Sequence, residues 1–150
     1  MRAIFIAAAA AVLISSAALA HSGLIVKPSA HGVAETLDRL EAVLKKKGVT
    51  VFARVDHAAG AKKAGLALAP TQVLIFGNPK LGTPLMQSRR AIGIDLPLKV
   101  LAWKDENGKV WLAYNDPAYL AKRHAIADRD PVFAKMAKIL GKLTDIATGR

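Results

Sequence analysis

The chain has 150 residues, a net charge of +11 and no cysteine. Its length fits one domain that is large enough to bury a hydrophobic core without disulfides. The lack of cysteine excludes disulfide bonds, thiol chemistry and a lipid anchor attached to cysteine. A basic domain attracts polyanions, but its lysines are dispersed rather than interleaved with aromatic residues. The charge therefore predicts a solvated basic surface, with weak attraction to anionic surfaces as the second interpretation.

The first twenty residues have the pattern of a secretory signal peptide. Met1–Arg2 is a positively charged start, Ile4–Leu13 is apolar throughout, and Ala18–Ala20 is an A-x-A cleavage site. The apolar stretch is too short for a membrane anchor, and no stop-transfer charges follow it. We expect cleavage after Ala20, a single domain over residues 21–150, and a periplasmic or secreted protein. Export argues against nucleic acid as a partner.

The first half of this domain predicts strands and helices in alternation. A short apolar strand is expected at residues 24–26, before a helix at residues 32–47. Apolar residues recur at helical spacing in that helix, and Gly48 follows it as the stop. A β-branched strand is expected at residues 49–55 and a short helix at residues 57–64.

The next segment is rich in glycine and proline. It follows the apolar run at residues 72–76, which fits a central strand covered on both faces. The segment Gly77–Thr83 is expected to be a loop. Thr83 and Pro84 then have the residue types of a helix cap and a first helical position, so a helix is expected at residues 85–89.

A hairpin and two helices complete the domain. Asn107–Gly108 separates apolar strands expected at residues 98–103 and 109–114, and a two-residue turn would place Trp103 opposite Leu112. Asp-Pro pairs then predict two helices, at residues 117–126 and 131–148.

The expected fold class is α+β. It has an antiparallel sheet of about five strands, with helices packed mainly on one face.

No catalytic motif is present. Serine has no G-x-S-x-G context, and no carboxylates are paired at a spacing typical of acid/base catalysis. A phosphate-binding loop would need Lys and then Ser or Thr directly after its second glycine, whereas Gly82 is followed by Thr83–Pro84. We expect no cofactor. Lys80 and the adjacent helix start are left as a candidate site for a carboxylate or sulfate, against the alternative of a structural turn.

Histidines give two further hypotheses. After cleavage His21 would offer an α-amine and an imidazole, a pair that suits copper, although a terminal residue is commonly unstructured. His57 or His124 could act with Asp116 as acid and base if the fold brings them together near Tyr114. The sequence does not show whether it does.

Four segments taken together resemble a known bacterial family. They are VFARVDHAAGAKKAGL, FGNPKLGTPLMQ, DLPLKVLAW and GKVWLAYNDPAYLAKRH. These segments are similar to the family called domain of unknown function 302, over about Leu24–Ile126. The resemblance implies a compact TATA-binding-protein-like α+β fold in a single copy, a homodimer, and no established activity. The final helix after Asp130 lies outside the resembling pattern.

The resemblance also implies where a site lies. The family's motif positions that suit ligand binding are occupied here by His57, Asn78, Lys80, Thr83, Gln87, Tyr114, Asp116 and His124. Pro79, Gly82 and Asn115 occupy further motif positions.

The leading hypothesis is an exported module that binds a small anion or a protein partner near Gly77–Thr83. An enzyme using the histidines and copper handling at His21 are the alternatives. A homodimer is also expected, because the hairpin aromatics would overfill one face of a thin sheet.

Overall fold

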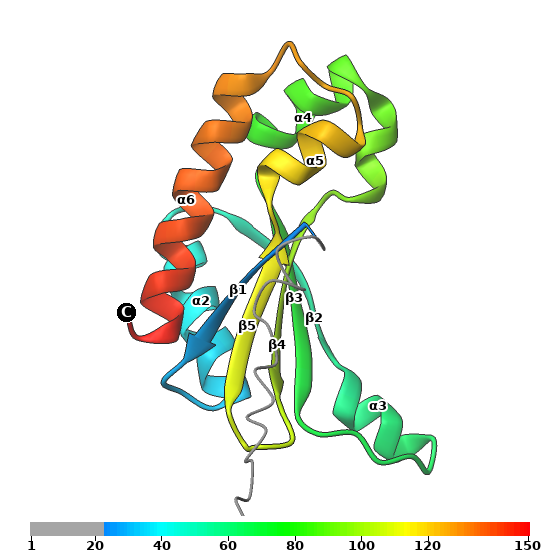
Figure 1. The fold of residues 1–150 in the computed structure, drawn as a ribbon, viewed down its shortest axis with the longest axis vertical. Coiled ribbons are helices and arrows are strands. Elements are labelled where there is room, and N and C mark those ends of the chain that lie inside the picture. Colours follow the sequence, from blue (N-terminus) through cyan, green and yellow to red (C-terminus); the bar gives the residue numbers. More distant parts are fainter. Residues whose placement is uncertain (1–22) are drawn as a thin grey trace, which may run out of the picture.

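The computed structural model describes residues 23–150, and within them the chain forms one antiparallel sheet with helices on one face and at its ends (Figure 1). The strand order is β1-β5-β4-β3-β2. The strands are β1 (Leu24–Ser29), β2 (Thr50–Asp56), β3 (Thr71–Gly77), β4 (Leu98–Lys104) and β5 (Val110–Asn115). The helices are α2 (Val33–Lys46), α3 (His57–Lys63), α4 (Pro79–Ser88), α5 (Pro117–Arg123) and α6 (Asp130–Thr148), with a 3₁₀ helix η1 (Arg90–Ile94).

The two long helices, α2 and α6, lie side by side against one face of the sheet. The short helices α4 and α5 stand at one end of the sheet, and α3 projects from the opposite end (Figure 1). This arrangement confirms the expected α+β class with helices mainly on one face. It also separates the sequence segments that bear the candidate residues into two distant groups.

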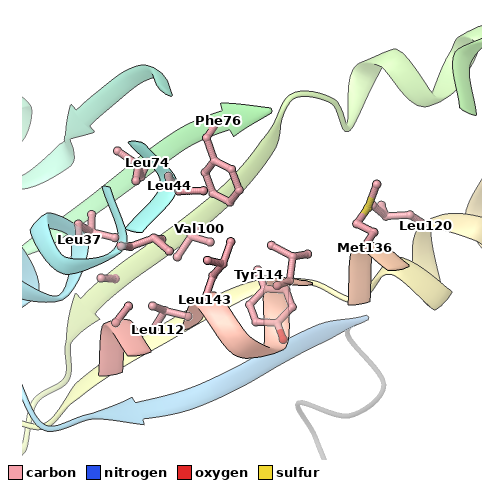
Figure 2. Close-up of a cluster of buried hydrophobic side chains, with 14 of the residues drawn as sticks. Leu37, Leu44, Leu74, Phe76, Val100, Leu112, Tyr114, Leu120, Met136 and Leu143 are labelled. Atoms are coloured by element: carbon pink, nitrogen blue, oxygen red, sulfur yellow. The ribbon is translucent and has the colours of Figure 1, made fainter. Parts of the chain in front are cut away.

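The hydrophobic core fills the space between the sheet and the two long helices. Alternate residues of the three inner strands point into it, and Leu74, Val100 and Leu112 have no exposed surface. Leu37 of α2 and Leu143 of α6 belong to the same cluster (Figure 2). The helical spacing of apolar residues in α2 and α6 therefore produces the layer that covers this face.

The other face of the sheet, the open face, has no helix packed on it among the described residues. The apolar run in β3 was expected to be covered on both sides, and this expectation is wrong. Leu74 and Phe76 are buried under the helices, but Val73 and Ile75 on the open face are only half-buried. An apolar run fits either situation, because an open sheet face can be apolar too.

The hairpin between β4 and β5 differs in register from the expected one. Trp103 lies opposite Trp111 rather than Leu112. The turn is longer than two residues, because the Asp105 amide donates to the Lys109 carbonyl at 2.9 Å. Gly108 has φ +79° while Asn107 does not have positive φ. A type I turn followed by a left-handed glycine explains this geometry, whereas a two-residue type I′ turn needs positive φ at both central residues.

Two helix boundaries also differ from expectation. The helix predicted at residues 85–89 begins earlier, at Pro79, so Pro84 lies inside α4 and Thr83 is not its cap. The other difference is at α5, which ends at Arg123, short of the expected residue 126. The chain turns there through Ala125, which has φ 49°, and the Ile126 amide bonds back to the helix.

Candidate functional site

The start of α4 is built by Asn78. β3 ends at Gly77, and the Asn78 side-chain Oδ1 accepts a hydrogen bond from the Lys80 amide at 2.9 Å. Pro79 occupies a first-turn position, where its missing N–H costs nothing. The residues predicted to bind an anion here therefore make a helix cap first, because one of the free amides at the helix start is already occupied.

A cavity of about 380 Å³ lies behind this helix start, where α4 meets the beginning of β4 and α6. Its lining is mostly apolar and comes from five parts of the chain, namely Phe52, Gly77–Pro79, Leu81–Thr83 with Met86, Leu96–Leu98, and Met136. Asn78 and Thr83 are its polar side chains.

A β-bulge contributes one wall of this cavity. The register of β2 against β3 shifts between Val51 and Ala53, which leaves Phe52 unpaired. Phe52 is 56% exposed and still reaches the cavity, where it stands near Gly77. Bulges commonly turn one side chain toward a site in this way.

A second cavity of about 600 Å³ adjoins the first. The two have five lining residues in common, which are Gly77, Asn78, Leu81, Leu98 and Met136. The second extends between the end of α2 and α6, where Lys47, Lys138 and Lys142 join apolar residues in the lining. Among the described residues, no acidic side chain lines either cavity. We call the two cavities together the α4–α6 groove.

A third recess, of about 810 Å³, lies beside α3 and is the most open of the three. Leu66 and Leu68 in its lining are 68% and 50% exposed. It lacks the enclosing walls that the α4–α6 groove has.

Of the candidate residues, Asn78 and Thr83 meet at the groove. Lys80 and Gln87 are exposed on α4 and are not part of its lining. His57 is exposed at the start of α3, at the opposite end of the sheet (Figure 1).

The proposed histidine and Asp116 combination is not formed. The His124 Nε2 lies 2.6 Å from Asp95 Oδ2, and Asp116 instead caps α5 by accepting the Ala118 amide at 2.9 Å. His57 begins α3 and His124 follows α5, and these two helices lie at opposite ends of the sheet (Figure 1). The structure therefore gives no shared acid/base site to these three residues.

Tyr114 is buried in the core beneath α6, with 4% of its surface exposed (Figure 2). Burial raises the pKa of its phenol above the ordinary value of 10.0, the Thr144 hydroxyl opposes this shift, and the Asp145 and Asp116 carboxylates add to it. The Lys27 ammonium stands 5.9 Å from the ring centroid. Tyr114 is thus part of a buried polar cluster rather than of the groove.

The described part of the chain contains no candidate metal site. Within residues 23–150, no three His, Cys, Asp or Glu side chains gather to hold a metal ion. His21 lies outside the described residues, so copper binding at the mature N-terminus stays a prediction.

The sequence did not point to most of the groove. Four of its apolar lining residues, Phe52, Leu81, Met86 and Leu96, lie within the segments that resemble the family, but no site role was expected of them, and Met136 lies outside those segments. The sequence feature that pointed to the groove was the group of glycine and proline residues in Gly77–Pro84, which indicates a change of chain direction.

The chain matches the model of a known protein family. The model of the family described as domain of unknown function DUF302 matches residues 25–143. The match continues past Ile126 into α6, so most of the final helix lies within the family pattern, although the sequence resemblance ended before it.

A solved structure shares the fold. It is the crystal structure of an uncharacterized conserved protein DUF302 from Bacillus stearothermophilus, similar to this chain with a TM-score of 0.75. The sequence identity is 22%, and the similarity covers 83% of this chain and 98% of that one.

Curated relatives carry a different name. The chain is 52% identical over 134 residues to "Fluoride-specific ion channel FluC 1" of Brucella suis biovar 1, covering 89% of this chain and 53% of that protein. It is equally similar to "Fluoride-specific ion channel FluC 2" of Brucella melitensis biotype 1, covering 50% of it. The chain thus spans about half the length of these relatives. In residues 23–150, no helix has the length and apolarity needed to cross a bilayer.

Proposed function

Because this chain belongs to the family of domain of unknown function DUF302, whose description names no activity, we propose a function from its groove. The protein is an exported module that binds a small molecule with a largely apolar body in the α4–α6 groove. The single observation that carries this proposal is the cavity of about 380 Å³ lined by apolar side chains and by Asn78 and Thr83. Small-molecule sites typically have volumes of roughly 300–1,000 Å³, mostly apolar walls and a few polar groups.

Gly82 offers a way to fill this cavity without disturbing the backbone. A Cβ atom added there would meet Leu96 Cδ1 at 3.6 Å, an ordinary contact, and the φ of Gly82 is not positive. A Gly82→Leu side chain would therefore occupy cavity space. Gly60 on α3 provides the matched control, because a Cβ there meets nothing within 4 Å.

The test is native mass spectrometry of protein purified from the periplasmic fraction. We expect a mass that starts at His21 together with the mass of a retained small molecule. Gly82→Leu should lose the retained molecule and Gly60→Leu should keep it. If both variants retained the molecule equally, the binding site would not lie in this cavity. A mass that includes residues 1–20 would contradict export.

A second candidate function is to work beside an anion channel. Its support is that relatives 52% identical to this chain are named fluoride-specific ion channels, and that this chain matches about half of their length. In those proteins the matching segment is joined to the remaining half in one polypeptide. We propose that the present chain acts as a separate partner of such a channel.

This candidate is tested by deleting the gene and measuring growth in fluoride. Heightened fluoride sensitivity, restored by the wild-type chain, together with copurification of a channel protein, would support the role. Unchanged fluoride sensitivity, with no copurified channel protein, would rule out this role.

A further inference from the structure

Three lysines at one end of the α4–α6 groove lack partners. Lys47, Lys138 and Lys142 all line the second cavity. Within residues 23–150, no hydrogen bond or ion pair engages their side chains. Two lysines elsewhere are ion-paired, Lys27 with Asp145 at 2.6 Å and Lys45 with Glu41 at 2.8 Å. Others in the described part of the chain, such as Lys62 and Lys135, have no such partner but line neither cavity of the groove, so position in the groove is what distinguishes Lys47, Lys138 and Lys142. The protein therefore places unneutralised positive charge beside an apolar cavity.

The arrangement of these lysines carries an energetic cost. Lys138 and Lys142 are four residues apart on α6, so they share one side of the helix, where like charges repel. Lys47 comes from the C-terminal end of α2 and faces the same cavity. The three side chains are exposed, so solvent weakens this repulsion, but none of the described residues that line the two cavities is acidic and able to neutralise the ammonium groups. An anionic group bound among the three ammonium groups would relieve the repulsion.

The apolar and the basic parts of the groove are continuous. Leu81, Leu98 and Met136 belong to the walls of both cavities, so one ligand can extend from the first into the second. We propose that the ligand is an amphiphile with one anionic group, a carboxylate or a sulfonate. Its apolar body lies against these shared walls, and its anion lies among Lys47, Lys138 and Lys142. This inference rests on the proposed binding function and specifies the ligand class.

The ligand is a free amphiphile rather than a lipid in a bilayer. The shared walls include Leu98 and Met136, and Met136 is only 2% exposed. The ligand must therefore enter a recess rather than lie on a protruding surface.

Two fluorescent probes separate the ligand class from binding itself. 1-Anilinonaphthalene-8-sulfonate and N-phenyl-1-naphthylamine have the same aromatic body, and only the first has a sulfonate. We expect the sulfonate probe to bind about tenfold more tightly to the wild-type protein, because three exposed charge contacts each contribute modestly. Sodium decanoate should displace the probe at lower concentration than 1-decanol. Displacement only by phosphatidylglycerol vesicles would overturn the assignment to a free amphiphile.

Charge-reversal substitutions of the groove lysines test where the anionic group of the ligand binds. Lys138→Glu with Lys142→Glu should weaken the sulfonate probe about tenfold and change the neutral probe less than about twofold. The control is Lys135→Glu with Lys62→Glu, which makes the same change in net charge. Lys135 lies on the same helix outside the groove lining, and Lys62 lies on α3. Equal weakening by both pairs would show a general charge effect and overturn the inference.

The outcomes distinguish the two proposals. If both probes bind equally and Gly82→Leu abolishes both, the binding function holds and the anionic ligand class is wrong. If neither probe binds the folded wild-type protein, the binding function itself is wrong. Circular dichroism of every variant confirms that the comparison is made between folded proteins.

Discussion

At the scale of single residues, a cluster of polar side chains links β1 to α6 by hydrogen bonds at the edge of the core. The Lys27 ammonium donates to the Gly141 carbonyl at 3.0 Å, the Thr144 hydroxyl at 2.8 Å and the Asp145 carboxylate at 2.6 Å. Tyr114 lies beside it with its phenol buried. The cluster gives partners to polar groups that this part of the core encloses, so its residues have a structural role.

The pH dependence of stability tests the burial of Tyr114. The pKa of its phenol is raised above 10.0 in the folded protein, chiefly by burial, whereas the unfolded chain releases this proton near 10. Above that pH the folded state holds more protons than the unfolded state, so the free energy of unfolding falls as pH rises. We expect Tyr114→Phe to lose less stability than the wild type between pH 8 and pH 11, measured by urea unfolding.

Tyr119→Phe is the control, because it removes another phenol from a half-buried position on α5. If Tyr114→Phe and the wild type lost the same free energy over this pH interval, burial would not govern the Tyr114 phenol.

At the scale of elements, α4 depends on its cap. The helix has Pro84 in its interior, which removes one hydrogen-bond donor, and the 3₁₀ helix η1 follows it closely. Asn78 is the residue that fixes where this helix starts and, because it also lines the groove, it couples the helix boundary to the site.

Removing the cap should therefore weaken α4. We expect Asn78→Ala to lower the free energy of unfolding by about 1 kcal/mol, since a cap side chain lost to alanine typically costs that much. Asn78→Asp, which keeps the acceptor, should be close to wild type. Gln87→Ala on the exposed side of the same helix is the control. Urea unfolding of the four proteins measures the effect, and equal midpoints for Asn78→Ala and Gln87→Ala would contradict it.

At the scale of the whole molecule, the open face of the sheet is a largely apolar surface, in which Lys99 of β4 is an exposed charged residue. Trp103 and Trp111 are cross-strand neighbours there, and Val73, Ile75 and Leu101 share the face. Five strands spaced about 4.8 Å apart, with six residues of about 3.3 Å each, make a face of roughly 500 Å². Monomeric proteins rarely expose apolar patches larger than a few hundred Å². Two such faces together reach the roughly 1,000 Å² that a specific interface needs.

We therefore propose that the protein is a homodimer joined through the open face. Leu101→Glu should convert it to a monomer, because the interface would bury an unpaired carboxylate. Ile94→Glu is the matched control, since Ile94 is 74% exposed on η1, away from the sheet face. Light scattering coupled to size-exclusion chromatography measures the mass of each. A wild-type monomer at working concentrations would refute the proposal.

Local patterns in the sequence were enough to predict most elements and the fold class, although the 3₁₀ helix η1 was not expected. Apolar periodicity, Asp-Pro starts and stopping glycines are local signals, and they placed the five strands and the two long helices α2 and α6 within a few residues. The error at the start of α4 arose where two local signals competed. Both Asn78–Pro79 and Thr83–Pro84 have the residue types of a helix start, and the first of them is used.

The positions of the groove and of the open face follow from tertiary packing. Phe52, Leu98 and Met136 meet at the cavity although they belong to β2, β4 and α6. Apolar residues have the same pattern whether they fill a core, line a cavity or face outward, so the sequence cannot separate these roles. The difference arises from packing: α4 stands at the end of the sheet rather than over it, and the space between it and α6 is left unfilled.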